Sequence, residues 1–205
     1  MGNRAVITTS RQDIGIYLHW NGGRDSVEAF LKYCELKGYR APSQDNYGWA
    51  RLCQVIGNFF GGGCSVGIGP YSNLDTDNGD NGVYIIDGWE IVGRKYFSGE
   101  EQHEYDLNEM LEEIDSRMPA SEQLGKGFIT GQRVKPDELK VGDEVYVVDY
   151  KGAISIEKVI GIGGDRWVNG TNVKGIPYVM RYSVMEPESN INNYLQEESY
   201  VIHEK

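Results

Sequence analysis

The stretch Ile14–Ser26 combines a strand pattern with the start of a helix. Its apolar residues recur at every second position, namely Ile14, Ile16, Leu18 and Trp20. Alternation of this kind places one set of side chains on one face of an extended segment. The pattern predicts a strand that runs through a Gly22-Gly23 turn into a helix. We expect Arg4–Thr9 to pair with this strand as an antiparallel hairpin.

Residues Ser26–Lys37 have the apolar spacing of an amphipathic helix. Asp25 precedes this segment and Glu28 stands three positions later, which is the capping-box pattern of a helix start. Gly38 stands where the end of a helix favours glycine. We therefore predict a first helix over Ser26–Lys37, with Asp25 as its N-cap.

Two further segments show helical spacing. Tyr47–Phe60 carries apolar residues along one side and ends at three consecutive glycines, 61–63. Asp106 and Glu109 predict the capped start of a third helix, which Pro119 ends and whose charges lie opposite its apolar face. The polar side of Tyr47–Phe60 has two interpretations, a solvated face or a recognition face for bases or nucleotides.

Short strands are predicted between the second and third helices. Cys64–Ile68 has strand composition, and Val83–Ile86 and Trp89–Val92 form a hairpin around an Asp87-Gly88 turn. The aspartates of the sequence LDTDNGDNG resemble a calcium loop. However, Gly79 stands at the fifth loop position instead of the sixth, and the twelfth is not a glutamate. We expect a polar hairpin loop there and no metal site.

Beyond the third helix the pattern changes to short strands. Residues 119–127 are small and polar, and they predict a linker between an N-terminal domain, 1–118, and a C-terminal domain, 128–205. Strand composition occurs over Glu144–Asp149, Ile154–Gly161, Tyr178–Ser183 and Tyr200–His203. The sequence LKVGDEVYVV resembles the entry to small SH3-like barrels. The predicted fold class is α+β: a mixed domain with an antiparallel sheet and three helices, followed by a small all-β, SH3-like barrel.

The chain is acidic, with 20 Lys and Arg against 31 Asp and Glu and a formal net charge of −11. This balance argues against direct binding of duplex DNA, because affinity for phosphates comes from clustered Lys and Arg. Residues 100–122 hold nine carboxylates beside the single base Arg117. They form either a solvated helix face or a surface for a basic partner protein. The residues expected to meet such a partner are Glu109, Glu112, Glu113 and Asp115.

The cysteines, the lengths of the apolar runs and the motif spacings argue against several classes of protein. The three cysteines, Cys34, Cys53 and Cys64, include no C-x-x-C pair, which argues against a zinc finger and favours a reducing cytoplasm. No apolar run reaches the roughly 18 residues that a membrane span requires. We expect no membrane segment and no classical export signal. No spacing typical of a cofactor site occurs, so we expect no cofactor.

The turn after the first strand pair carries the candidate chemistry. Its glycines let a ligand approach the backbone, and an arginine pairs well with phosphate. The candidate ligand-binding residues are Asn21, Arg24, Tyr47 and Arg51, and the candidate catalytic residues are His19 and Arg24. Together they indicate a nucleotide- or RNA-directed enzyme, or a nucleotide-sequestering protein. The opposing interpretation is structural: His19 belongs to the sheet, and Asp25 and Glu28 occupy the amides at the helix start.

Three sequences within the first 115 residues, MGNRAVI, IYLHWNGGRDSVEAFLKY and YGWARLCQVIGNFFGG, resemble a group of uncharacterised proteins. These proteins are encoded by phages and other mobile elements of Gram-positive bacteria. The resemblance implies a genomic setting and no catalytic residues. Accessory proteins in that setting often counter host defence, as anti-CRISPR proteins do. The leading hypothesis is therefore an inhibitor that binds a basic host protein, such as a nuclease complex, through its acidic surface; a structural module without a defence role is a further alternative.

Overall fold

The computed structural model describes residues 2–135, 138–148, 153–162, 165–168, 171–174, 177–180, 192–194 and 200–203. The chain divides into two compact units, Met1–Gln123 and Leu124–Lys205. Helices and sheets occur in both, and antiparallel strand pairs dominate the sheets. The protein is therefore mixed α+β, in agreement with the predicted fold class.

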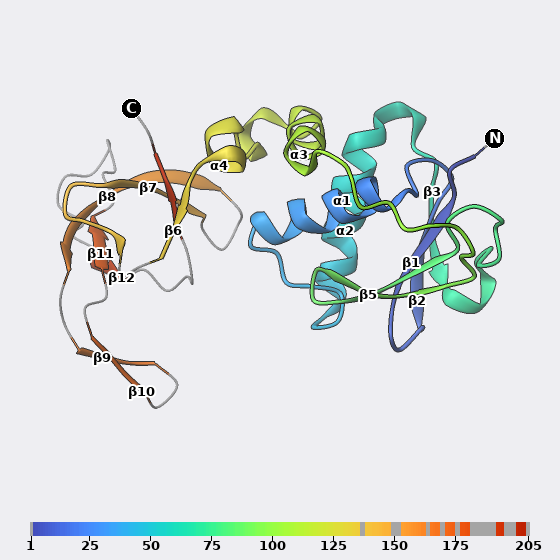
Figure 1. The fold of residues 1–205 in the computed structure, drawn as a ribbon, viewed down its shortest axis with the longest axis horizontal. Helices are drawn as coiled ribbons and strands as arrows, with labels where there is room; N and C mark the ends of the chain where they lie inside the picture. Colours follow the sequence, from blue (N-terminus) through green and yellow to red (C-terminus); the bar gives the residue numbers. More distant parts are fainter. Residues whose placement is uncertain are drawn as a thin grey trace. The chain divides into compact units, whose positions relative to one another are not determined.

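A five-stranded sheet underlies the first unit (Figure 1). Its strands are β1 (Ala5–Thr9), β2 (Ile14–Leu18), β3 (Val66–Pro70), β4 (Val83–Asp87) and β5 (Glu90–Lys95), in the order β3-β2-β1-β4-β5. β1 and β2 form the predicted antiparallel hairpin, in which Ile7 lies opposite Ile16 and both are fully buried. β2 ends at Leu18, so the prediction that Trp20 continues its apolar face is wrong. Trp20 is 44% exposed.

One strand pair is parallel, which the prediction of an antiparallel sheet missed. β4 runs parallel to β1, with Val83 opposite Val6. Since β3 and β4 are not neighbours, residues 71–82 cross the sheet and do not form the expected polar hairpin loop. Arg4 fixes the end of this crossing, because its Nε donates to Asp80 Oδ2 at 2.6 Å. This hydrogen bond lowers the pKa of Asp80.

Three α-helices complete the first unit: α1 (Arg24–Leu36), α2 (Asn46–Phe60) and α3 (Leu107–Ser116). α1 is the central one, because it packs against α2, α3 and β5 (Figure 1). Phe30 of α1 meets Phe59 of α2 edge-on, with 5.2 Å between the ring centroids. Short 3₁₀ helices follow the longer elements at η1 (Gly61–Gly63), η2 (Tyr71–Asn73) and η3 (Ala120–Glu122).

The start of α1 differs from the prediction. Gly23 in extended conformation is the N-cap, so Asp25 lies in the first turn instead of capping the helix. Its carboxylate accepts a hydrogen bond from the Ser26 amide at 2.7 Å. The end of α1 is as predicted: Gly38 has a φ of +66°, and its amide donates to the carbonyl of Glu35. This is the backbone arrangement that glycine favours after a helix.

The other two helices agree closely with their patterns. α2 begins at Asn46, one residue before the predicted start, and Asp45 accepts a hydrogen bond from the Tyr47 amide. α3 is capped by Asp106 as predicted, because its carboxylate accepts from the Glu109 amide at 3.1 Å. Both caps satisfy an amide that has no partner inside the helix.

The predicted β4–β5 hairpin is confirmed, but its turn is displaced by one residue. Asp87 pairs with Glu90, so Gly88 and Trp89 form the two-residue turn. Gly88 occupies the first turn position with a φ of +58°, which glycine adopts at low cost. The displacement places Trp89 at the tip of the hairpin and not in a strand.

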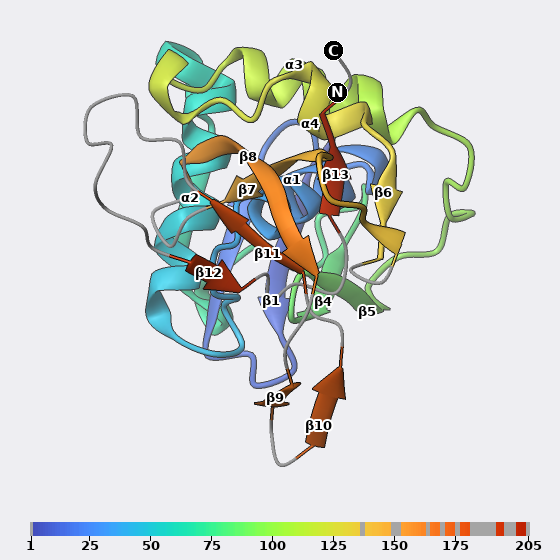
Figure 2. The same cartoon turned by 90° about the vertical axis from the view of Figure 1, so that its left-hand side faces the viewer.

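The second unit is built mainly from antiparallel strands (Figure 2). A helix, α4 (Lys126–Thr130), precedes a six-stranded sheet in the order β12-β11-β8-β7-β13-β6. The strands of this sheet are β6 (Arg133–Val134), β7 (Glu144–Val148), β8 (Ile154–Ile162), β11 (Pro177–Met180), β12 (Asn192–Tyr194) and β13 (Tyr200–Ile202). β9 (Asp165–Val168) and β10 (Thr171–Lys174) form a separate two-stranded sheet. Leu139, Val145 and Val159 form a buried cluster.

The segment predicted as a linker, 119–127, is partly helical. It contains η3 and the first residues of α4. The boundary between the two units, after Gln123, falls inside it. In the part of the chain that the structure describes, no helix combines the length and the apolar character needed to span a membrane.

Candidate functional site

The turn between β2 and α1 does not assemble the predicted catalytic pair. His19 is exposed, and its Nδ1 lies 3.5 Å from the hydroxyl of Tyr17. Arg24 instead contacts Glu28 at 3.3 Å and Glu101 at 3.4 Å. The side-chain nitrogen of Asn21 lies 3.5 Å from the hydroxyl of Ser26. The guanidinium of Arg24 is therefore engaged by carboxylates of its own unit.

The two candidate residues on α2 lie in other surroundings. Tyr47 is 69% exposed, and Arg40 stacks on its ring. Arg51 stacks on Tyr39 at 4.8 Å and donates to Gln54 at 2.9 Å. Neither residue lines the cleft that contains Arg24. Tyr47 and Arg51 thus contact neighbours within the unit, and no hydrogen bond or ion pair among the described residues joins either of them to Arg24.

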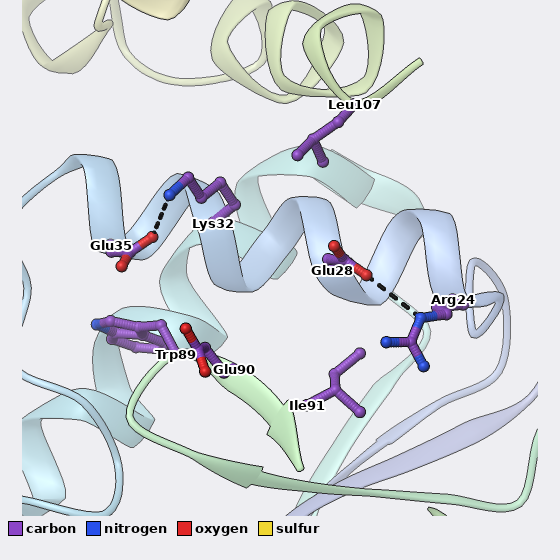
Figure 3. A pocket seen from close by; sticks show the side chains of 8 residues that line it. All are labelled: Arg24, Glu28, Lys32, Glu35, Trp89, Glu90, Ile91 and Leu107. Carbon is purple, nitrogen blue, oxygen red and sulfur yellow. Dashed lines mark hydrogen bonds and ion pairs between the residues drawn. The ribbon is translucent and has the colours of Figure 1, made fainter. Parts of the chain in front are cut away.

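A cleft of about 390 Å³ lies between α1 and β5 (Figure 3). Charged residues of α1 form one wall of the cleft. Leu107, the first residue of α3, lines it on the side away from β5. The lining comprises Arg24, Glu28, Lys32, Glu35, Trp89, Glu90, Ile91 and Leu107. A neighbouring recess of about 260 Å³ shares Glu35, Trp89 and Glu90 with it. We call the part around these three residues the open end of the cleft.

The other end of the cleft, around Arg24, is closed by an ion-pair network. Glu101 pairs with Arg24 and also accepts two hydrogen bonds from Arg94, at 2.7 and 2.9 Å. Glu28 pairs with Arg24 and accepts a hydrogen bond from the Tyr105 hydroxyl at 2.5 Å. Burial and this hydrogen bond raise the pKa of Tyr105 to about 12. We call these five residues the closed end.

Arg94 anchors the closed end in the core. Its guanidinium lies between the rings of Tyr84 and Phe97, at 3.7 and 4.0 Å from the centroids. Only 12% of its side chain is exposed. Its Nη1 donates to both carboxylate oxygens of Glu101 and its Nη2 to the carbonyl of Asn81, and stacking with two separate donors favours arginine over lysine. The charges at this end therefore hold the segment after β5 against α1.

The acidic helix α3 has one buried carboxylate and three more accessible ones. Asp115 is 6% exposed and accepts a hydrogen bond from the Tyr33 hydroxyl at 2.6 Å, so its predicted place in a partner surface is wrong. Burial and this bond raise the pKa of Tyr33. Glu109 and Glu113 are exposed, and Glu112 is half-buried. We call Glu109, Glu112 and Glu113 the acidic face of α3, since residues three and four apart share a face.

The described residues include no group of three His, Cys, Asp or Glu side chains close enough to hold a metal ion. In the predicted loop, Asp75 and Asp80 both face Arg4, at 4.0 and 2.6 Å. A guanidinium therefore takes the place that a cation would need there.

Sequence reasoning missed the open end of the cleft. Trp89 was expected in a strand, and no motif connects it to Glu35 of α1. A signal was present for Asp115: it stands four residues after Leu111 and three before Met118, and both of these are buried. That spacing places it beside the apolar stripe of α3.

Comparisons of the chain with known proteins identify no relative. No protein-family model matches the chain, and no curated protein or solved structure is significantly similar to it.

Proposed function

We propose that the protein binds a basic, nucleic-acid-handling host protein through the acidic face of α3. The observation that carries this proposal is the accessibility of that face. Glu109 and Glu113 are exposed, and neither forms a hydrogen bond or ion pair through its carboxylate with any described residue. Carboxylates that are not engaged internally attract a basic surface and speed its association. The buried residues Leu111 and Ile114 hold the face outward.

The proposal includes a biological role and a setting. The protein acts as a counter-defence accessory protein of a phage or mobile element, in the manner of an anti-CRISPR inhibitor, and blocks a nuclease complex. Support for this role comes from the resemblance of the first 115 residues to proteins of such elements. Its cytoplasmic location is part of the same proposal, and the three cysteines are free thiols, as a reducing compartment would keep them.

The second unit is proposed to be an SH3-like barrel that serves as a binding module. Gly142, at a φ of +104°, forms the expected turn before β7. The cluster of Leu139, Val145 and Val159 gives the unit a core of its own. A crystal structure of the full chain tests this assignment, and an open sheet without barrel closure would contradict it.

Capture from a host lysate tests the proposed partner. The tagged full-length chain is expected to retain a basic nuclease or nucleic-acid-binding protein, identified by mass spectrometry, and to release it as salt rises from about 0.05 to 0.5 M. The double substitution Glu109→Lys/Glu113→Lys is expected to lower the captured amount at least tenfold, because it inverts the charge of the face.

A matched variant controls for net charge. Asp13→Lys/Asp77→Lys makes the same change in charge at two exposed positions outside α3. It is expected to capture the partner like the unaltered chain. If the α3 variant retains the partner equally well, or if both variants lose it equally, the acidic face is not the binding surface.

A further inference from the structure

Trp89 at the open end of the cleft is held in place by the loop that follows α1. Its indole Nε1 donates to the carbonyl of Tyr39 at 2.8 Å. The neighbouring Gly88 amide donates to the Ser43 hydroxyl at 3.0 Å. The ring thus borders both the main cleft and the adjoining recess in a fixed position (Figure 3). A binding surface whose side chains are fixed in advance loses less entropy on binding.

Within the described part of the chain, four other aromatic rings of the first unit carry a stacked guanidinium group, whereas Trp89 does not. Guanidinium groups stack on the rings of Tyr39, Tyr47, Tyr84 and Phe97. Among the residues that the structure describes, none stacks on Trp89, although indole is the aromatic group that attracts cations most strongly.

Glu90 places a carboxylate beside this ring. Its side chain forms no hydrogen bond or ion pair with a described residue. Glu35 lines the same end from α1, where it contacts Lys32 at 2.5 Å. The cleft and the recess together are lined by Glu28, Glu35, Asp87 and Glu90 against Arg24 and Lys32. The excess of carboxylates makes the open end complementary to a cation, and Ile91, on the same side of α1 as Trp89, provides an apolar contact for an alkyl chain.

We propose that the open end of the cleft binds the guanidinium group of an arginine side chain on the partner protein. The guanidinium stacks on Trp89 and pairs with Glu90, while its methylene groups lie towards Ile91. Arginine fits better than lysine because it combines a flat stacking surface with a forked donor for a carboxylate. This inference rests on the proposed function, since it names the kind of residue that the basic partner inserts. Buried arginines are frequent anchors of protein interfaces.

A titration that needs no partner tests the cleft. The peptide acetyl-Gly-Arg-Gly-amide is added to the isotope-labelled full-length chain, and amide chemical shifts are followed by NMR. The largest shifts are expected at Glu35, Trp89 and Glu90. Glu90→Gln is expected to weaken binding about fivefold and Trp89→Phe about threefold, as cation–π and ion-pair contacts at accessible sites predict. Asp77→Asn, at an exposed position outside both the cleft and α3, is the matched control and is expected to bind as before.

The outcomes separate this inference from the proposed function. Binding that Glu90→Gln weakens, with the lysine peptide acetyl-Gly-Lys-Gly-amide at least threefold weaker, supports the arginine site. Absence of binding at millimolar peptide, equal binding of both peptides, or no effect of Glu90→Gln overturns it. Free agmatine binding at least tenfold more tightly than the peptide would identify a small-molecule site and overturn the partner arginine. Peptide binding beside a failed lysate capture would refute the acidic face of α3 alone.

Discussion

The two ends of the cleft use the same kinds of side chain for opposite purposes. At the closed end Arg24, Glu28 and Glu101 are joined to one another and to Arg94 and Tyr105. At the open end, the ring of Trp89 and the carboxylate of Glu90 have no such partner among the described residues. Charges that are paired within the unit hold its segments together, whereas an accessible carboxylate beside a fixed ring is available to another molecule. Whether a carboxylate of the cleft stabilises the fold or is available to another molecule therefore depends on the side chains around it.

The largest expected effect comes from breaking the closed end at Arg94. Arg94→Ala removes the stacking between Tyr84 and Phe97 and leaves Glu101 without its best partner. We expect the free energy of unfolding, measured by urea denaturation, to fall by about 3 kcal/mol. Arg94→Lys keeps the charge without the flat fork and should recover less than half of the loss. Equal stability of Arg94→Ala and the unaltered chain would show that the network is not structural.

The second largest effect is expected on α3, where a carboxylate paired within the unit can be compared with an accessible one. Tyr33→Phe removes the hydroxyl that donates to buried Asp115, and we expect the free energy of unfolding to fall by about 1.5 kcal/mol. Glu113→Gln, on the accessible side of the helix, should change it by less than about 0.5 kcal/mol. Similar losses for the two variants would remove the distinction between a carboxylate engaged internally and one facing solvent.

A smaller effect is expected at alkaline pH. The pKa of Tyr105 is about 12 in the folded chain, against about 10 in an unfolded one. Its contribution to stability is therefore complete below pH 10 and is lost as the pH rises towards 12, because the unfolded chain releases this proton first. Tyr105→Phe should make the decline in stability between pH 10 and 12 shallower. An unchanged slope in urea denaturation across that range would contradict the assigned shift.

The smallest effect is expected at the open end. Lys32 and Glu35 are a largely exposed pair, with 41% and 48% of their side chains accessible. Glu35→Gln should change the free energy of unfolding by about 0.3 kcal/mol, since exposed pairs contribute little. A loss above 1 kcal/mol would mean that the open end also has a structural role.

Local features of this fold were predictable, and features that join distant segments were not. The pattern around Asp106 identified α3 and its cap, and Gly38 marked the end of α1. The N-cap of α1 was misplaced because Asp25 and Glu28 match a capping box, whereas the extended Gly23 begins the helix earlier. Helix starts and ends can be predicted from the sequence because they depend on the backbone conformations that a few neighbouring residues adopt.

The site depended on what the sequence pattern does not encode. The cleft joins α1 to the tip of a later hairpin, where the displaced turn places Trp89. The pairing of Arg24 was missed for the same reason, since one of its two carboxylates is Glu28 and the other is the distant Glu101. Pairings between distant residues depend on how the strands and helices are arranged in space. The apolar spacing along the sequence does not predict that arrangement.

The parallel pairing of β1 and β4 also sets an order of events during synthesis. β1 begins at Ala5, but the strand that completes its second edge begins only at Val83. A nascent chain can form the β1–β2 hairpin early, yet one edge of β1 stays open until α1, α2 and β3 have been made and β4 follows them. Contacts so distant in sequence slow folding. We therefore expect the open edge of β1 to be most exposed to wrong strand pairing before β4 is added to the sheet.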